Sequence, residues 1–188
     1  MQELSLYILD ITMNGVKAGA AKISITIKEN GPLMDICIAD NGCGMSPETV
    51  EKLKDPFFTT RTTRKVGMGV PLFTEMAQQT GGDVTVKSIE APAEGHGTVI
   101  EGTFHTDSID CVPLGDVSST LTTLIQGSPD IDFVFTHSAP DRGLNVELDT
   151  ETIRSELDGV PLNTPAVLEW IREYVDEQYA GSGKEGKL

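Results

Sequence analysis

Asp40-Asn41-Gly42-Cys43-Gly44-Met45 is the stretch that decides the fold of this chain of 188 residues. An apolar segment leads into Asp40, whose carboxylate can accept a hydrogen bond from the exocyclic amine of a flat base. Gly42 and Gly44 have no side chains, so they let such a base approach the backbone. A ligand-free β-turn is the alternative interpretation, because Asp, Asn and Gly are common turn residues. The segments on either side of the stretch decide between the two.

A basic, hydroxyl-rich loop follows this stretch in an otherwise acidic sequence. Its candidate nucleotide contacts are Phe58, Thr59, Thr60, Arg61, Thr63 and Lys65. The loop leads into Gly67-Met68-Gly69-Val70 at the predicted start of a helix, where free N–H groups and the helix dipole favour phosphate. An ordinary surface loop is the alternative, but the local reversal of charge argues against it. The candidate base site is therefore followed directly by a candidate phosphate site.

A polar helix face precedes both segments. Asp10 and Asn14 lie four residues apart in a predicted helix, so they are neighbours on one face, and Lys17 lies on the same face. A carboxylate can orient or deprotonate a nucleophile, whereas an amide oxygen suits Mg²⁺ beside phosphate. The ammonium group of Lys17 could reach a phosphate oxygen. A solvated face of an amphipathic helix is the alternative interpretation.

The hydrophobic periodicity predicts the secondary structure. Helical spacing is found over residues 4–18, 46–53, 70–79, 116–126, 151–157 and 165–179. Alternation typical of strands is found over 22–28, 34–39, 84–88, 99–104, 131–135 and, more weakly, 144–148. Residues 55–67 show no period and are predicted to form a loop. Thr98 comes just before a predicted strand, from which its hydroxyl could approach Asp40.

This pattern predicts an α/β two-layer sandwich, with a mixed, mostly antiparallel sheet and helices on one face. Residues 1–105 form one alternating unit, and 106–180 form a small α/β extension without a catalytic pattern. The strand at 131–135 is apolar enough either to join the main sheet or to start a second layer. We expect the extension to contact a partner protein or a second copy of the chain. The Gly/Lys tail at 181–188 is predicted to be disordered.

Composition excludes several classes of protein. The formal net charge of −15 argues against nucleic acid as a partner, because no basic surplus is present to displace counterions from phosphates. No apolar run approaches the roughly 20 residues of a membrane span, and no secretory signal is visible. Cys37, Cys43 and Cys111 match neither a disulfide framework nor a zinc site, which favours a reducing, cytoplasmic setting.

The ordered segments resemble the Bergerat-fold (GHKL) ATPases, a superfamily shared by sensor histidine kinases, Hsp90, type II topoisomerases and MutL proteins. Residues 10–17 are similar to the N box, and Asp40-x-Gly42-x-Gly44 to the G1 box. Residues 56–61 are similar to the F box of histidine kinases, and Gly67-x-Gly69 to the glycines that end the ATP lid. The segments Gly81–Ser88 and Gly95–Thr98 resemble the two that follow in that kinase branch. The match covers roughly the first 105 residues.

The resemblance implies a function for each segment. It implies ATP with Mg²⁺ as cofactors, adenine contact by Asp40, Mg²⁺ contact by Asn14, and Asp10 as the catalytic base. The backbone path around the nucleotide would be made by Gly42, Gly44, Met45, Gly67, Met68, Gly69 and Val70, closed by Thr98. The lid residues Arg61, Thr63 and Lys65 would bind phosphate.

Three departures from the family pattern limit this transfer. Asp10 stands where many members have Glu, and the shorter side chain could weaken hydrolysis while ATP binding survives. Val70-Pro71 replaces the usual residues after the lid, so the entry into the helix could be altered. The N box begins close to Met1, which leaves no room for the phosphoacceptor hairpin of sensor kinases. His96, His105 and His137 are expected at the surface or at strand ends rather than as phosphoacceptors.

Two functions therefore remain open from the sequence. The chain could be a stand-alone protein kinase, similar to anti-sigma kinases, or a slow ATPase. It could instead be a non-catalytic ATP sensor whose lid is ordered by the nucleotide. A MutL-like DNA clamp is less favoured, because such clamps carry a basic transducer domain and this chain is acidic throughout.

Overall fold

The computed structural model describes residues 3–53 and 69–181 and contains one six-stranded sheet in the order β3-β4-β2-β1-β5-β6. The helices are α1 (Leu4–Lys17), α2 (Pro47–Lys52), α3 (Gly69–Gln79), α4 (Val117–Gly127), the 3₁₀ turn η1 (Pro140–Arg142), α5 (Thr150–Glu156) and α6 (Pro165–Gly181). The strands are β1 (Lys22–Asn30), β2 (Leu33–Asp40), β3 (Asp83–Ile89), β4 (Gly97–His105), β5 (Asp132–Ala139) and β6 (Leu144–Asp149).

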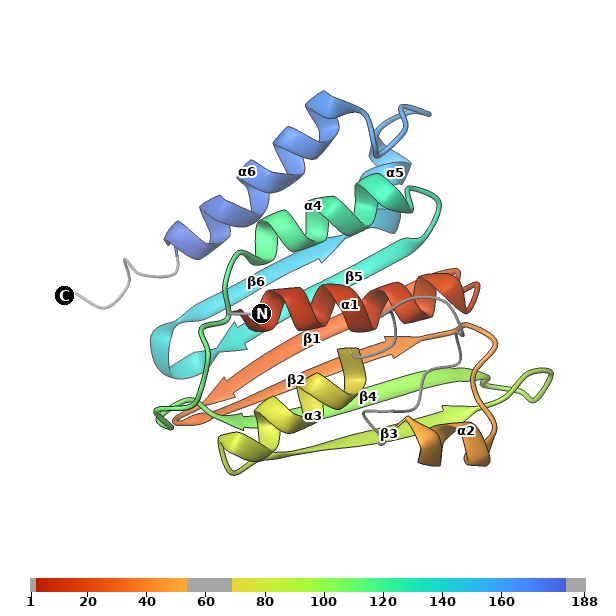
Figure 1. Cartoon of the computed structure of the whole chain (residues 1–188). Helices are drawn as coiled ribbons and strands as arrows, with labels where there is room; N and C mark the ends of the chain where they lie inside the picture. Colours follow the sequence, from red (N-terminus) through yellow and green to blue (C-terminus); the bar gives the residue numbers. More distant parts are fainter. Residues whose placement is uncertain (1–2, 54–68, 182–188) are drawn as a thin grey trace.

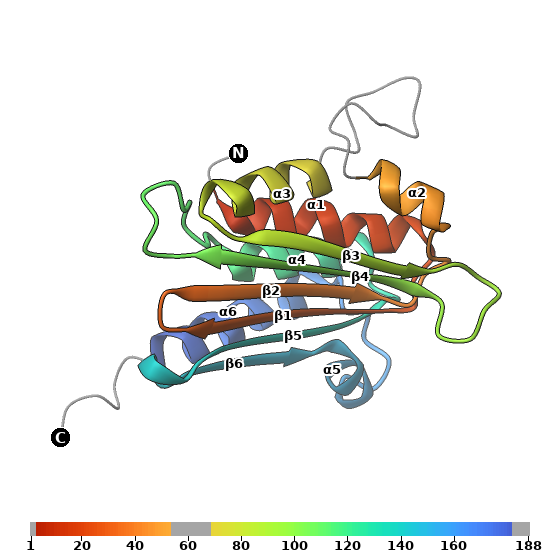
Figure 2. The ribbon, with the colours of Figure 1, turned by 90° about the horizontal axis from the view of Figure 1, so that it is seen from below.

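The sheet is mixed and mostly antiparallel, as the sequence predicted. The pairs β1–β2, β2–β4, β3–β4 and β5–β6 are antiparallel, and β1–β5 is parallel. Helices α1, α3 and α4 lie on one face of the sheet, which gives a two-layer sandwich (Figures 1 and 2). Helix α6 packs on α4 and on β6. The predicted fold class is therefore confirmed.

The core lies between the helices and the sheet because the apolar residues follow the expected periods. In β1 the alternate residues Ile23, Ile25 and Ile27 are buried, and Leu4 and Ile8 of α1 belong to the same buried cluster. Further along the sheet, Phe73 of α3 meets Phe104 of β4 edge to face at a ring-centroid distance of 5.0 Å. Between them, Gly102 leaves room that a methyl group would fill, because an added Cβ would lie 2.5 Å from Cε1 of Phe73.

Polar caps fix where two of the helices begin. The hydroxyl of Ser46 accepts a hydrogen bond from the backbone N–H of Thr49 at the start of α2, where Pro47 is the first helical residue. The carboxylate of Asp116 accepts a 2.8 Å hydrogen bond from the backbone N–H of Ser119 at the start of α4. Both caps lie where the sequence predicted the helices to begin.

The C-terminal segment joins the main sheet, which settles the choice that the sequence left open. β5 pairs in parallel with β1 over seven residues, from Lys22–Asp132 to Lys28–Ser138. β5 also runs past the predicted end at Phe135 to Ala139. As a result His137 lies inside the strand and is only 2% exposed, so the expectation of a surface or strand-end position was wrong for this residue.

Candidate nucleotide-binding site

The candidate base site is centred on Asp40, the last residue of β2. Asp40 pairs with Thr98 across β2–β4 and with Ile23 across β1–β2, so the sheet fixes its backbone on both sides. Its carboxylate accepts a 2.9 Å hydrogen bond from the backbone N–H of Gly42. Burial raises the pKa of Asp40, although the N–H groups of Gly42 and Thr98 act in the opposite direction. A partly buried carboxylate with a remaining acceptor oxygen can receive an exocyclic amine.

The glycines after Asp40 are required by the protein's own packing. Gly44 has a φ of 66°, and an added Cβ would lie 1.8 Å from the carbonyl oxygen of Ile89. At Gly42 an added Cβ would lie 2.7 Å from the Cβ of Ala18. The sequence interpretation gave these glycines a role in ligand approach. The structure adds that the loop must pass closely between the end of α1 and the end of β3.

The hairpin of β3 and β4 holds this loop through side-chain hydrogen bonds. The Ser88 hydroxyl accepts a 2.8 Å bond from the backbone N–H of Met45 and donates to the carbonyl of Gly97 at 2.9 Å. Ser88 is also 2.9 Å from the Thr98 hydroxyl, so the loop and β4 share one hydroxyl pair. The sequence predicted that Met45 and Thr98 belong to the site. It placed Ser88 in the family-like segment Gly81–Ser88 but did not name it as a site residue.

His96 is a second contact that the sequence interpretation missed. Its Nδ1 lies 2.6 Å from the carbonyl oxygen of Gly42, and because a carbonyl can only accept, Nδ1 carries the proton. The backbone N–H of Ala91 donates to the carbonyl of Cys43 at 2.8 Å, so the same hairpin end contacts the loop twice. The sequence analysis placed His96 in the family-like segment Gly95–Thr98, but the contact with Gly42 spans 54 residues and was not predicted.

Helix α1 brings its polar face to the two glycine segments. An added Cβ at Gly15 would lie 2.9 Å from the Cβ of Asp40, so α1 touches the base site directly. An added Cβ at Gly69 would lie 3.2 Å from Oδ2 of Asp10, which places this carboxylate beside the start of α3. Asn14 lies between Asp10 and Gly15 in α1 and is exposed.

Some of the predicted site residues can be placed and others cannot. Lys17 is exposed near the end of α1. Gly69 and Val70 begin α3 and are buried, and Pro71 lies in its first turn, where a helix tolerates proline. The unusual Val70-Pro71 pair is thus compatible with a regular helix. The remaining predicted contacts lie outside the described residues: Phe58, Thr59, Thr60, Arg61, Thr63, Lys65, Gly67 and Met68.

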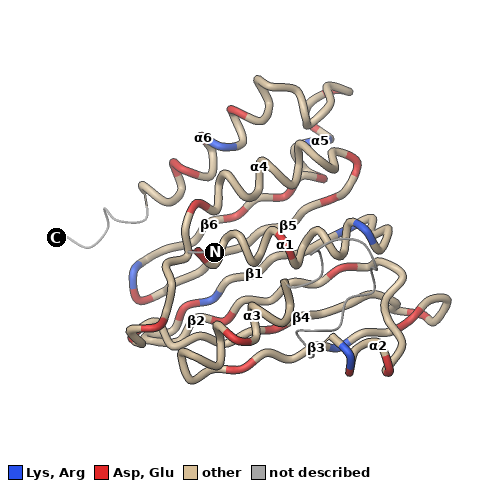
Figure 3. Tube along the Cα trace, in the orientation of Figure 1, with Lys and Arg blue, Asp and Glu red and all other residues tan. Residues whose placement is uncertain are grey.

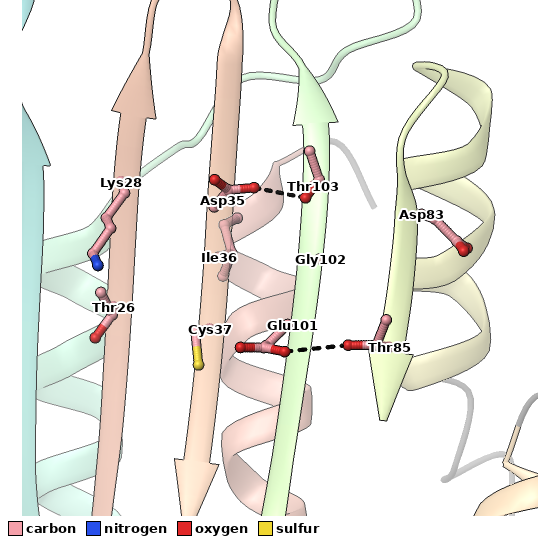
Figure 4. Close-up of a pocket in the computed structure, with 10 residues that line it drawn as sticks. All are labelled: Thr26, Lys28, Asp35, Ile36, Cys37, Asp83, Thr85, Glu101, Gly102 and Thr103. Atoms are coloured by element: carbon pink, nitrogen blue, oxygen red, sulfur yellow. Dashed lines mark hydrogen bonds between the residues drawn. The ribbon is translucent and has the colours of Figure 1, made fainter. Parts of the chain in front are cut away.

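A separate hollow lies on the opposite face of the sheet. It has a volume of about 560 Å³ and opens on β1 to β4. Its side chains pair with one another across the strands: the Thr103 hydroxyl donates to Asp35 at 2.6 Å, and the Thr85 hydroxyl donates to Glu101 at 3.3 Å (Figure 4). Among the candidate nucleotide contacts that lie within residues 3–53 and 69–181, none lines this hollow.

These features define an α/β sandwich whose candidate nucleotide site lies at one end of the sheet. Residues 2–108 match the family described as "Histidine kinase-, DNA gyrase B-, and HSP90-like ATPase". Because the match covers more than half of the chain, the chain belongs to this family of ATP-binding proteins.

Curated relatives include sensor histidine kinases. The chain is 32% identical over 90 residues to the sensor histidine kinase ZraS of Salmonella typhimurium, a match that covers 46% of this chain and 19% of ZraS. It is 34% identical over 93 residues to the sensor histidine kinase WalK of Bacillus subtilis, covering 47% of this chain and 15% of WalK. The matches therefore span a fifth or less of the length of these relatives.

The solved structures include one with similar overall architecture. The ATPase domain of Aquifex aeolicus MutL, complexed with ADP, aligns over 100% of both chains with a TM-score of 0.55 and 12% identity. At this identity the likeness supports the fold alone. No helix in the described part of our chain is long and apolar enough to cross a membrane.

Proposed function

We propose that this protein binds Mg·ATP between α1, the loop after β2, β4 and the start of α3. The observation that carries the proposal is the meeting of Gly15, Asp40 and Thr98, from three separate segments of the family pattern. Adenine would hydrogen-bond to the Asp40 carboxylate. The phosphates would extend toward the start of α3, where backbone N–H groups favour anions.

The residues present suit a magnesium ion beside the phosphates. Asn14 is an exposed residue on the same helix face as Asp10, and Mg²⁺ prefers oxygen ligands such as its amide oxygen and is shared with phosphate. When bound, the ion would neutralise phosphate charge. Lys17 and the predicted lid residues Arg61, Thr63 and Lys65 would add positive charge.

The first experiment is calorimetric titration of ATP into the wild type and Asp40→Asn, with and without Mg²⁺. We expect magnesium-dependent binding in the wild type and a loss of at least about 100-fold in the variant, because an amide presents a donor as well as an acceptor to the adenine amine. Glu101→Gln, on the opposite face of the sheet, is the matched control. ATP affinity that is equal in Asp40→Asn and the wild type would reject this site.

We propose that the bound ATP is used for phosphate transfer to a partner protein or for slow hydrolysis, with Asp10 as the base. Replacement of Asp10 by Asn should abolish turnover while ATP affinity stays within about threefold. Phosphate release and transfer from γ-labelled ATP would be measured on the same preparation used for binding. Unchanged turnover in Asp10→Asn would reject Asp10 as the base.

A non-catalytic ATP sensor is the second candidate function, and one observation favours it. The carboxylate of Asp10 lies against the first residue of α3, where a negative charge is stabilised by the helix dipole and can serve structure instead of catalysis. ATP would then order the lid, and residues 106–180 would present a changed surface to a protein partner or a second copy of the chain. Slower proteolysis within residues 59–65 in the presence of ATP, without any phosphate release, would support the sensor.

We place this activity in the cytoplasm, with protein and not nucleic acid as the partner. The three cysteines, Cys37, Cys43 and Cys111, are free thiols in the structure. Asp and Glu residues are spread over both the helices and the sheet, with few Lys and Arg among them (Figure 3). A surface of this charge repels a phosphate backbone.

A further inference from the structure

A second cavity lies at the opposite end of the sheet from Asp40. It has a volume of about 450 Å³, within the range of about 300–1,000 Å³ that is typical of small-molecule sites. Met34, Leu114 and Leu144 provide apolar walls. Asp40 ends β2 and Met34 lies near its beginning, so the two sites are separated by about 20 Å along the strand.

A connected set of polar side chains forms the rest of this cavity. His137 of β5 has Nε2 2.8 Å from Oε1 of Glu29 and Nδ1 2.9 Å from the hydroxyl of Tyr179. Arg142 donates to the same Oε1 of Glu29 at 2.5 Å. These four residues come from β1, β5, η1 and α6, and all of them line the cavity. They form what we call the His137 relay.

The hydrogen-bond partners determine which atoms of the His137 relay carry protons. Burial lowers the pKa of His137, although the adjacent Glu29 raises it, so the imidazole is neutral near pH 7. A carboxylate can only accept, so Nε2–H donates to Glu29 and Nδ1 accepts from the O–H of Tyr179. Burial also raises the pKa of Tyr179, which keeps its proton in place. The phenol oxygen is left with acceptor capacity.

The His137 relay leaves free hydrogen-bond acceptors and free hydrogen-bond donors beside the apolar walls of the cavity. Both bonds to Glu29 end on Oε1, so Oε2 accepts no bond from the residues of 3–53 and 69–181. Arg142 has a largely exposed guanidinium group that makes one hydrogen bond within those ranges. The cavity therefore presents a carboxylate oxygen and a phenol oxygen as acceptors and, next to the carboxylate, guanidinium N–H groups as donors.

We propose that this cavity binds a small aliphatic amino acid. Its ammonium group would donate to Oε2 of Glu29 and to the Tyr179 oxygen, and its carboxylate would accept from Arg142. The aliphatic side chain would pack against Met34 and Leu144.

The charges select a zwitterion over simpler ions. A ligand with a carboxylate alone would be repelled by Glu29, which is only 16% exposed at its side chain, and by neighbouring Asp141. A ligand with an ammonium group alone would be repelled by Arg142. A zwitterion satisfies both groups at once, and bonds to ionised partners are the stronger kind. This site does not rest on the proposed nucleotide site.

The test is calorimetric titration of L-leucine and L-methionine into the full-length protein. We expect saturable binding of one molecule per chain. 4-Methylpentanoate, which lacks the ammonium group, and 3-methylbutylamine, which lacks the carboxylate, should each bind at least about tenfold more weakly. Absence of binding by both amino acids up to about 10 mM, or equal binding by either analogue, would overturn the proposal.

Variants locate the binding within the cavity. Tyr179→Phe and Arg142→Gln should each weaken amino-acid binding at least about fivefold, whereas Tyr174→Phe, a matched change on the outer face of α6, should not. Leu144→Trp should fill the cavity and abolish binding, which keeps the test valid if a relay variant does not fold. Circular dichroism would check each fold. Unchanged affinity in Tyr179→Phe, Arg142→Gln and Leu144→Trp would overturn the assignment.

Discussion

At the scale of single residues, the ionised form of Asp40 is disfavoured by burial, at the position that we propose binds adenine. Its pKa is raised by burial, so the folded state disfavours the ionised carboxylate that an adenine amine would need. A neutral side chain of the same shape should fit the protein better than the carboxylate does. Stability and binding therefore make opposite demands on this position.

Asp40→Asn should consequently stabilise the folded protein while removing the proposed ATP affinity. We expect the free energy of unfolding at pH 7 to rise by on the order of 0.5–1 kcal/mol, because an amide costs less to bury than a carboxylate. A raised folded-state pKa means that the stability from this group is present at low pH and lost as pH rises through that pKa. The gain should therefore shrink toward pH 4.5. Urea unfolding of the wild type and Asp40→Asn at pH 7 and pH 4.5 measures this difference in unfolding free energy. A variant that is less stable than the wild type at pH 7 would contradict the prediction.

His137 makes the opposite contribution to the pH dependence of stability. Its folded-state pKa is lowered from the ordinary value of 6.5, so its stabilising contribution is present above pH 6.5 and is lost as pH falls below that value. His137→Gln should flatten the fall in unfolding free energy between pH 7 and pH 5, by at most about 1.4 kcal/mol per pH unit. His105→Gln, at the end of β4, is the control. The same slope in wild type and His137→Gln would contradict the prediction.

The sequence predicted local structure well where the signal lies within a short segment. The order of Asp40, Gly42 and Gly44 in one turn was enough to propose a base site, and the structure shows the close packing of the backbone at both glycines. The burial of His137 was missed because its partners Glu29 and Tyr179 lie 108 and 42 residues away along the chain. The polar run Thr136, His137 and Ser138 also lacks the apolar alternation of a strand. Contacts between residues so far apart in the sequence leave no pattern in the short stretches from which periodicity is judged.

At the scale of elements, α6 protects the outer edge of the sheet. β6 is an edge strand, and the side chain of Gln178 hydrogen-bonds to both backbone groups of Glu147, accepting from its N–H at 2.9 Å and donating to its carbonyl at 3.0 Å. The amide of Gln178 thus occupies the place that another strand would take. Exposed edge groups of this kind promote pairing with other chains.

Gln178→Ala should therefore loosen α6 and expose the edge. We expect a loss of about 1–2 kcal/mol in unfolding free energy, from two hydrogen bonds, together with increased self-association. Glu177→Ala, an exposed neighbour on the same helix, is the control. Chemical unfolding and light scattering at several concentrations give the two readouts. A monomeric variant of unchanged stability would show that the contact is unimportant.

Element boundaries followed from caps and periods, but the position of the C-terminal elements in the sheet did not. Ser46-Pro47 and Asp116 marked the starts of α2 and α4 within the sequence itself. The pairing of β5 with β1 depends on strands separated by about a hundred residues, and both a joined sheet and a second layer would bury the same apolar face. The packing of α4 against α1 and α6 in the folded protein distinguishes the joined sheet from the second layer.

At the scale of the whole molecule, the proposed division into residues 1–105 and 106–180 can be tested by truncation. β1 lies between β2 and β5, so a fragment ending at residue 105 would have β1 as an uncovered edge and would expose the surface of α1 that α4 covers. We expect the fragment to aggregate or to lose several kcal/mol of stability, because a buried apolar interface becomes exposed. Size-exclusion chromatography and urea unfolding measure this. A monomeric fragment of full stability would make residues 1–105 an independent domain.

The parallel pairing of β5 with β1 also sets an order of events during synthesis. The segment that resembles the ATPase family leaves the ribosome first, but β1 has no neighbour on one side until Ala139 has been made and released from the exit tunnel. Parallel strands form late because distant parts of the chain must meet. The nascent chain therefore passes through a period in which the edge of β1 is open to chaperones or to other nascent chains, and translation speed between Thr106 and Ala139 sets the length of that exposure.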